Sequence, residues 1–426
     1  MLSESIQVSH PPEATQNTPP SLAILNACHP GAWEKVGGIT LTARTLFHLK
    51  EAGIKKVVLL LSTDSIPIEL TKWQGTLELQ QVRAKVNIPG TILSITDLEQ
   101  RFLYIDTAHL IDPRLLYTLA SASGTTFAYI DPVDRERRVI RAGFLKIEDL
   151  HIWAKQGSAA LISHSGFLFP GDINPFCPEI RGPLTPYFME VRSKDDAREA
   201  TRLLIRSQQK KVMDLPAQFI DPPIENALTL LLCNTPVTPN MITLIGAAVG
   251  VVVAWLFWHG YFVAGALCTF LVEILDGVDG KLARTKLHYT KFGKYEDVID
   301  YIYENSWYVA LAVGLRDTAP NNLPAFLAGL LILSDTADNI VYTLAGRWYS
   351  KSIDLFSPFD ATFRRIAGRR NVYGIMFIFG FSLGYPFYTF AVVAVWAALT
   401  AVIHGVRLIQ YNRTMKKTLG QQAVGT

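Results

Sequence analysis

The chain has 426 residues, of which 49% are apolar and 18% charged, and its formal net charge is +3. This charged fraction is below the roughly one quarter that is usual for soluble proteins, and the apolar content excludes a mostly disordered chain. The near balance of 40 basic and 37 acidic residues gives no reason to expect nucleic acid as a partner. We therefore expect a folded protein with a membrane-embedded part.

The first half of the chain has the pattern of an α/β domain. Residues 1–20 are polar and contain four prolines, which predicts a disordered lead. Residues 21–211 then alternate short β-type runs with helical patterns, as α/β domains do. The clearest predicted elements are one helix, Thr42–Ala52, and four strands, Leu22–Asn26, Lys55–Ser62, Phe102–Asp106 and Thr126–Asp131.

This region resembles the sugar-phosphate nucleotidyltransferases. The run Val36–Arg44, followed by Ala-Gly-Ile at 52–54, is similar to their V-x-G-x-P-L-L-x-R … A-G-I stretch. The resemblance implies a Rossmann-like fold, a metal contact at Asp106 and a triphosphate contact at Lys35. Two departures weaken it: the loop 27–35 has a single glycine, and Arg192 replaces a second metal aspartate. The domain is thus either degenerate, with a regulatory or structural role, or an active cytidylyltransferase.

The second half is dominated by long apolar runs. Residues 212–238 read as an amphipathic linker, 239–415 as a membrane domain and 416–426 as a tail. A bilayer core about 30 Å thick needs about 20 helical residues, and Lys and Arg favour the cytoplasmic loops. The basic residues gather in alternate loops, which predicts an all-α six-helix transmembrane bundle with both termini cytoplasmic; a large soluble helical core is the alternative. The six predicted helices are 239–258, 261–284, 293–315, 323–347, 371–383 and 386–410.

The second of these helices ends in paired carboxylates. Asp276 and Asp279 are spaced i, i+3 and so share one helix face. Charges at membrane depth are costly and therefore indicate function, and paired carboxylates suit Mg²⁺ or Mn²⁺ with substrate phosphate. We expect Gly280 to let a ligand approach the backbone, and Lys281 and Arg284 to bind phosphate.

The third helix presents an acidic stripe of its own. At 100° per residue, Asp297, Asp300 and Glu304 fall within a narrow sector around Gly293. Three acids in one stripe repel one another unless a cation lies among them. A solvated polar face is the alternative explanation, but the same helix continues directly into an apolar run.

Together these residues resemble the signature of the CDP-alcohol phosphatidyltransferase family, D-x2-D-G-x2-A-R-x8-G-x3-D-x3-D. The resemblance covers roughly 210–415 and implies transfer of a substituted phosphate from a CDP-alcohol donor to an acceptor hydroxyl, on a lipid or a polyol phosphate, with release of CMP. It also implies a divalent cation and, because members are commonly dimeric, a homodimer. The matching positions are Asp276, Asp279, Gly280, Ala283, Arg284, Gly293 and Asp297.

One position departs from this signature. Tyr301 stands where the family has a fourth aspartate, assigned there to activating the acceptor hydroxyl. Asp300, which also lies on the metal stripe, or Glu304 could supply the base instead. The departure could equally mean a different acceptor, a changed reaction or lost catalysis.

The family resemblance gives further residues a role. Thr238, Asn240 and Thr243 resemble a T-P-N-x2-T stretch near the nucleotide site, although ordinary helix capping explains them equally well. Arg369 and Arg370 are expected to bind the phosphate of the acceptor, unless they serve only the positive-inside rule or contact lipid headgroups.

Two acidic residues of the fourth helix have no role in the signature. Asp335 and Asp338 are predicted to form an ion pair with Arg316 or Arg347, or to line a polar cavity. The order of the two regions resembles the bifunctional inositol-phosphate cytidylyltransferase–phosphotransferases. The sequence therefore predicts a membrane phosphotransferase, with a non-catalytic scaffold that binds CDP-alcohols or divalent ions as the alternative.

Overall fold

The computed structural model describes residues 20–63, 70, 73, 76–85, 87–95, 98–290, 296–319 and 322–424. The described chain divides into two compact units, an N-terminal unit of residues up to Ser207 together with Thr285–Leu287, and a C-terminal unit of Gln208–Arg284 together with the residues from His288 onward.

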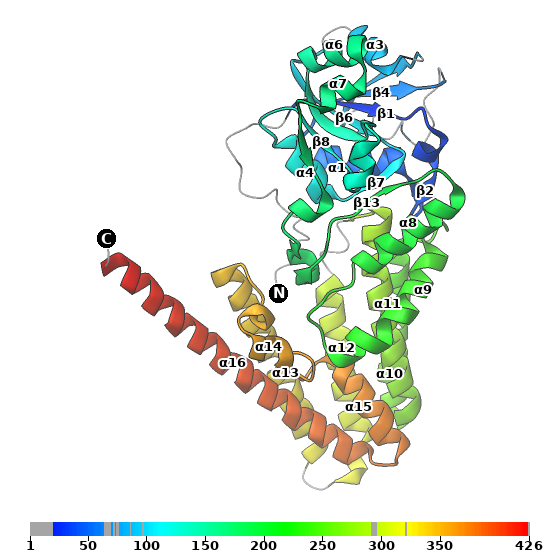
Figure 1. The fold of residues 1–426 in the computed structure, drawn as a ribbon. Coiled ribbons are helices and arrows are strands. Elements are labelled where there is room, and N and C mark those ends of the chain that lie inside the picture. Colours follow the sequence, from blue (N-terminus) through cyan, green and yellow to red (C-terminus); the bar gives the residue numbers. More distant parts are fainter. Residues whose placement is uncertain are drawn as a thin grey trace. The chain divides into compact units, whose positions relative to one another are not determined.

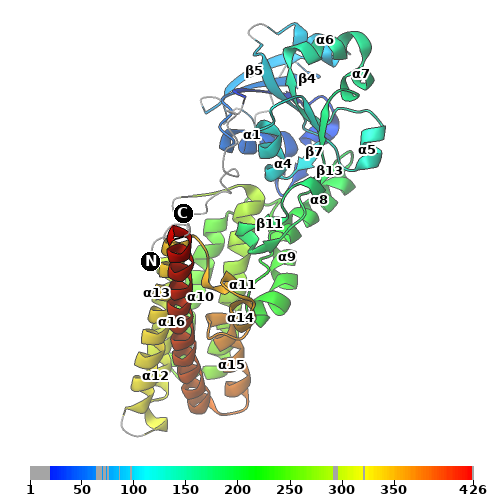
Figure 2. The same cartoon turned by 60° about the vertical axis from the view of Figure 1, so that its left-hand side comes forward.

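The N-terminal unit is built on a mixed seven-stranded sheet with the order β10-β8-β9-β6-β1-β4-β5. Neighbouring strands are parallel except at β9, which is antiparallel to both β6 and β8. Figure 2 shows β4 and β5 side by side at one end of this order. The strands are β1 (Leu22–Asn26), β4 (Lys56–Leu61), β5 (Glu78–Arg83), β6 (Arg101–Asp106), β8 (Thr126–Ala128), β9 (Ala142–Lys146) and β10 (Gly166–Leu168).

Both faces of the interior strand β1 are buried, which explains its uninterrupted apolar sequence. Leu25 packs in one apolar cluster with Leu46 and Leu103, and Ile24 in a second one with Leu60 and Phe102. The α/β fold predicted for this region is therefore confirmed, with helices on a largely parallel sheet.

The predicted strand Thr126–Asp131 is wrong at its C-terminal end. It stops at Ala128, because Asp131 caps the next helix and its Oδ1 accepts a hydrogen bond of 2.7 Å from the Asp134 amide. The helices of this unit are α1 (Leu41–Glu51), α3 (Ile88–Leu93), α4 (Pro113–Ala120), α5 (Pro132–Glu136), α6 (Ile147–Gln156), α7 (Ser158–Ile162) and α8 (Lys194–Ser207). The short strands are β2 (Lys35–Val36), β3 (Ile39–Thr40), β7 (His109–Ile111), β11 (Phe176–Cys177), β12 (Gly182–Pro183) and β13 (Phe188–Glu190).

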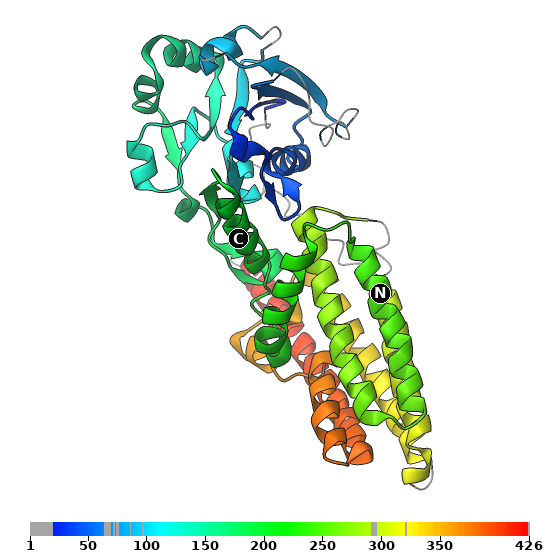
Figure 3. The same cartoon turned by 90° about the vertical axis from the view of Figure 1, so that its right-hand side faces the viewer.

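The C-terminal unit is helical. Figure 1 shows its longest helix, α16, running beside α13, and Figure 3 shows the other long helices roughly parallel to one another. An apolar core of Val253, Trp307, Leu331, Phe377 and Phe390 joins five of them. The helices are α9 (Asp221–Leu232), α10 (Pro239–Trp258), α11 (Phe262–Lys286), α12 (Glu296–Gly314), α13 (Leu323–Tyr349), α14 (Pro358–Phe363), α15 (Arg370–Ser382) and α16 (Pro386–Val424).

Three helices of the described chain are long and apolar enough to cross a membrane: Pro239–Trp258, Leu323–Tyr349 and Pro386–Lys416. This supports membrane association, but the predicted six-span bundle is not confirmed. Helices α11 and α12 carry the charged motif residues. Helix α15 has 13 residues, which is about 20 Å of helix against a hydrocarbon core of about 30 Å.

Candidate active site

The first motif carboxylates lie on α11, next to the start of α10. Asp279 is 3% exposed, and its Oδ2 accepts a hydrogen bond of 2.6 Å from the Thr243 hydroxyl on α10. Thr243 thus fixes the orientation of this carboxylate. Asp276, three residues earlier, is more accessible, with 38% of its side chain exposed.

The carboxylates of α11 and α12 converge on one guanidinium group, that of Arg370 at the start of α15. Its Nη2 lies 2.6 Å from Asp276 Oδ2, and its Nη1 lies 3.6 Å from Asp300 Oδ2. The same Nη1 contacts the Glu304 carboxylate and donates to the Tyr303 hydroxyl at 3.1 Å. The structure therefore brings together three of the acids that the sequence places on two different helices.

This arrangement suits a hard divalent cation, because carboxylate oxygens from two helices already surround a positive charge. Asp297 lies on α12, but its side chain is outside the described residues, as is Gly293. Among the side chains that are described, no three His, Cys, Asp or Glu groups already stand in metal-binding geometry.

The motif glycine Gly280 and the nearby Gly277 each have a side chain against them. A Cβ on Gly280 would lie 3.4 Å from Arg284 Nη1, so the guanidinium of Arg284 lies over this glycine. A Cβ on Gly277 would lie 1.9 Å from Glu225 Oε1 of α9. The space at Gly277 is thus taken by α9. The space at Gly280 is bordered by the guanidinium of Arg284.

Lys281 lies apart from the converging carboxylates. Its Nζ donates to Gln209 Oε1 at 2.8 Å and Asn226 Oδ1 at 2.7 Å, and it pairs with Glu225 Oε2 at 2.8 Å. This placement disagrees with a phosphate-binding role, because the ammonium group is already surrounded by protein oxygens. The sequence shows the charge of Lys281 but gives no sign of what packs across from it.

Helix α9 contributes a second buried acid. Asp221 is 1% exposed and accepts a hydrogen bond of 3.4 Å from the Asn371 amide. Burial, together with the neighbouring charge of Glu225, raises the pKa of Asp221 to about 7. Neither acid of α9 belongs to the signature, and the sequence signal for them is two acids four residues apart in an amphipathic segment.

The other residues expected at the nucleotide site have local roles. Thr238 caps α10 by accepting from the Met241 amide at 3.4 Å, and Asn240 Oδ1 accepts from the Thr290 hydroxyl at 2.9 Å. Ala283 is half-buried on α11. Of the three residues at the start of α10, Thr243 is the one that contacts a motif carboxylate.

The two arginines that are expected to bind the acceptor have different partners in the structure. Arg369 Nη2 lies 3.6 Å from Asp338 Oδ2, and its guanidinium stacks 4.1 Å above the Tyr342 ring. Asp338 also pairs with His404 Nδ1 on α16 at 2.6 Å. The predicted ion pair of Asp338 with Arg316 or Arg347 is therefore wrong, because Arg369 and His404 take that position.

Asp335 likewise has a different partner from the one expected. The Tyr373 hydroxyl of α15 donates to its Oδ1 at 3.1 Å. Arg316 pairs with the adjacent, exposed Asp317 instead.

Tyr301 points away from the acidic stripe. Its hydroxyl is 2.7 Å from Thr336 Oγ1 on α13. Tyr301, which stands at the position of the family's fourth aspartate, thus links α12 to α13, whereas Asp300 and Glu304 lie next to Arg370.

The two residues expected at a nucleotidyltransferase site lie on different sheets of the N-terminal unit, Asp106 on the seven-stranded sheet and Lys35 on the two-stranded sheet of β2 and β3. Lys35 begins β2 and is exposed, and Asp106 ends β6, where its Oδ1 accepts from the Ala108 amide at 3.1 Å. Glu190, at the end of β13, contacts Arg141 at 3.2 Å and Arg192 at 2.7 Å. Burial opposes ionisation of Glu190, but these two arginines hold its pKa below the ordinary value. Guanidinium groups therefore contact the carboxylate beside the expected second metal position.

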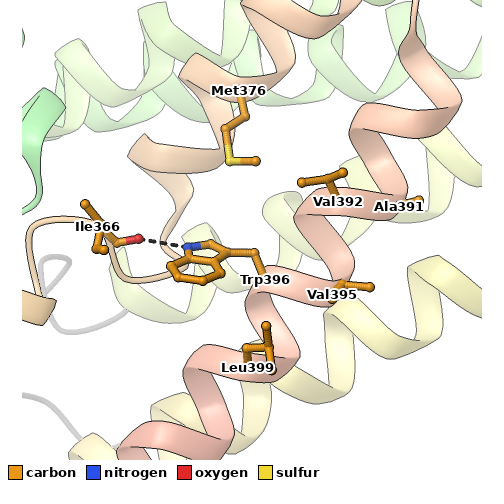
Figure 4. Close-up of a pocket in the computed structure, with 7 residues that line it drawn as sticks. All are labelled: Ile366, Met376, Ala391, Val392, Val395, Trp396 and Leu399. Atoms are coloured by element: carbon orange, nitrogen blue, oxygen red, sulfur yellow. Dashed lines mark hydrogen bonds between the residues drawn. The ribbon is translucent and has the colours of Figure 1, made fainter.

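A groove between α15 and α16 is a different kind of feature (Figure 4). Its one polar side-chain group, the Trp396 indole N–H, donates to the Ile366 carbonyl at 2.8 Å. It offers nothing that would bind phosphate. Its lining consists of Ile366, Met376, Ala391, Val392, Val395, Trp396 and Leu399.

Part of this chain is similar in sequence to curated proteins. Residues 236–404 match the model of the family described as CDP-alcohol phosphatidyltransferase. A bifunctional IPC transferase and DIPP synthase of Archaeoglobus fulgidus is 35% identical over 113 residues, 26% of this chain and 23% of that protein. The protein of the same name from Thermococcus kodakarensis is 31% identical over 125 residues, 29% of this chain and 28% of its own length. The matched stretch spans about a quarter of these relatives.

Solved structures resemble each half of the chain weakly. Phosphatidylinositol phosphate synthase of Mycobacterium tuberculosis, with CDP-DAG bound, has a TM-score of 0.33 at 20% identity and covers 44% of this chain and 93% of its own. A 2-C-methyl-D-erythritol 4-phosphate cytidylyltransferase of Thermus thermophilus has a TM-score of 0.30 at 17% identity and covers 42% and 97%. Scores this low carry no conclusion. The segment that matches the CDP-alcohol phosphatidyltransferase model, 236–404, contains the converging carboxylates of α11 and α12.

Proposed function

We propose that this protein is an integral membrane CDP-alcohol phosphotransferase that moves a substituted phosphate from a CDP-alcohol to an acceptor hydroxyl and releases CMP. The observation that carries the proposal is the convergence of Asp276, Asp300 and Glu304 on one cationic point within the family segment. Three apolar helices support membrane embedding. Six spans, cytoplasmic termini and a homodimer belong to the same proposal.

Asp276, Asp279, Asp297 and Asp300 would hold Mg²⁺ or Mn²⁺, which neutralises charge on the diphosphate and on the departing CMP. The Thr243 hydroxyl holds Asp279 in a fixed orientation. Arg284, whose guanidinium lies over Gly280, would donate to phosphate oxygens. Positioning and fixed charges supply most of the rate in such a reaction.

The acceptor side is built from α12 and α15. Asp300 or Glu304 takes the proton of the acceptor hydroxyl, and the hydroxyl oxygen attacks the phosphorus distal to cytidine. The bond between that phosphorus and the bridging oxygen then breaks, and CMP leaves with the bridging oxygen. Arg370 contacts both acids and can also reach an anionic group on the acceptor.

The test is CMP release by the purified protein in detergent with Mg²⁺. CDP-diacylglycerol and CDP-inositol are offered separately, each with polyol and polyol-phosphate acceptors. We expect release with one donor, loss of that release in Asp279→Asn, and wild-type release in Asp317→Asn, an acid whose side chain is 90% exposed. Donor binding without turnover would support the scaffold alternative instead.

For the N-terminal unit we propose a non-catalytic role. The contacts of Arg141 and Arg192 with Glu190 support it, because they place positive charge where a catalytic metal would need acids. The test is pyrophosphate release from CTP with sugar or polyol phosphates as acceptors. Release by the wild type that is lost in Asp106→Asn would overturn this assignment.

A further inference from the structure

Lys281 is nearly fully buried, at 3% exposure, although it belongs to a helix end rich in charge. Its Nζ lies 2.7–2.8 Å from three oxygens, those of Gln209, Asn226 and Glu225. An ammonium group has three protons and no acceptor, so these three contacts use its full capacity. The partners come from two stretches, the residues before α9 and α9 itself.

Glu225 also contacts α11 one turn before Lys281. Its carboxylate lies over Gly277, where a Cβ would come within 1.9 Å of Oε1 and 2.3 Å of Cδ. A side chain at 277 would therefore displace the Glu225 carboxylate from its present position. Next to this polar contact, Ile274, Val278 and Leu282 of α11 pack against apolar side chains of α9, among them Leu228 and Leu232.

The face of α11 that α9 covers differs from the one that carries the motif acids. At 100° per residue, Lys281 and Val278 lie within about 100° of Gly277 on one side. Asp276 and Asp279 lie about 100° and 160° from Gly277 on the other side. The α9 segment thus packs behind the carboxylates and leaves their own face to the ligands.

We propose that Lys281 is a positioning residue that fastens residues 209–232 to the back of α11 and thereby sets the rotation of this helix, which aims Asp276 and Asp279. The effect on turnover rests on the proposed function, whereas the fastening itself does not. The proposal replaces the phosphate-binding role that the sequence suggested for Lys281.

The buried Lys281–Glu225 pair leads to a specific expectation for the stability of variants. Removing one partner of such a pair leaves an uncompensated buried charge and is strongly destabilising, whereas replacing both partners together costs much less. Lys281→Met and Glu225→Gln should each destabilise the protein, and the double variant should be more stable than the sum of the two losses allows. Arg316→Met, which removes an exposed cation paired with Asp317, is the matched control.

The experiment measures melting temperature in detergent for wild type, both single variants, the double variant and the control. We expect each single variant to melt at least about 5 °C lower and the double variant to regain at least half of the summed loss. In the turnover assay, Lys281→Met should lower kcat at least about tenfold while the donor KM stays within about threefold, because the reacting groups are misaligned and the donor contacts remain.

Two outcomes would overturn the proposal. One is an additive double variant, which would mean that Lys281 and Glu225 do not act together. The other is Lys281→Met with an unchanged melting temperature and a raised donor KM, the result expected of a phosphate contact. If wild type has no turnover but the melting data show coupling, the proposed function fails and the fastening role stands.

Discussion

Replacing Arg370 by methionine is expected to tighten divalent-cation binding while it weakens turnover. The guanidinium lies 2.6 Å from Asp276 Oδ2 and 3.6 Å from Asp300 Oδ2, two proposed metal ligands. A cation on the same oxygens would lie roughly 5 Å from the guanidinium, given metal–oxygen distances of about 2.1 Å. At an effective dielectric constant of about 20, charges of +2 and +1 at that separation repel by roughly 6.6 kcal/mol.

Most of this repulsion will be relieved by salt and by movement of the arginine. If a quarter remains, it is about 1.7 kcal/mol, or somewhat more than about tenfold in Kd. The measurement is Mn²⁺ binding to the detergent-solubilised protein by electron paramagnetic resonance, with Arg316→Met as the control. We expect Arg370→Met to bind Mn²⁺ at least about tenfold more tightly than wild type and to turn over at least about tenfold more slowly at saturating Mn²⁺. Unchanged or weaker Mn²⁺ binding by a folded Arg370→Met protein would refute the reasoning.

Three further changes test other parts of the structure. Burial lowers the pKa of His48 from 6.5 to about 3. The contribution of the neutral His48 side chain to the free energy of unfolding is therefore intact above pH 6.5 and is lost as the pH falls toward 3, with a loss of about 2 kcal/mol at pH 5. The variant His48→Gln should remove this part of the acid sensitivity of the melting temperature. Gly314→Ala would place a Cβ 2.1 Å from the Phe257 carbonyl oxygen and should lower the melting temperature by at least about 5 °C, whereas Gly329→Ala, with open space around it, should be neutral or stabilising. Tyr301→Phe should keep CMP release within about threefold of wild type, since the lost hydrogen bond is worth about 1 kcal/mol; a hundredfold loss would instead place Tyr301 among the reacting groups.

The sequence predicted helix and strand positions well where the apolar period decides them. Leu22–Asn26 is a strand with the predicted bounds, and the helix predicted at 323–347 is Leu323–Tyr349. The last helix was predicted to end at 410 but continues to Val424, because hydropathy falls there while helix propensity does not. Hydropathy also could not establish six spans, since α15 is short and α11 and α12 are charged.

In the site, too, the sequence predicts some features, and others depend on tertiary packing. Residue spacing placed Asp276 and Asp300 on faces that the structure brings together at Arg370. The contacts of Lys281 and Gly277 could not be predicted from the sequence, because both residues contact Glu225, which belongs to another helix. A charge in a motif shows that an interaction partner is needed, but the partner is set by the tertiary fold.

The most direct test of the central claim follows the transferred group itself. The donor carries a label on its phosphoalcohol, and labelled product and CMP are quantified together in wild type, Asp279→Asn and Asp317→Asn. A CDP-alcohol phosphotransferase should form one labelled product for each CMP, lose both in Asp279→Asn and keep both in Asp317→Asn. CMP release without label on the acceptor, or transfer that persists in Asp279→Asn, would contradict it.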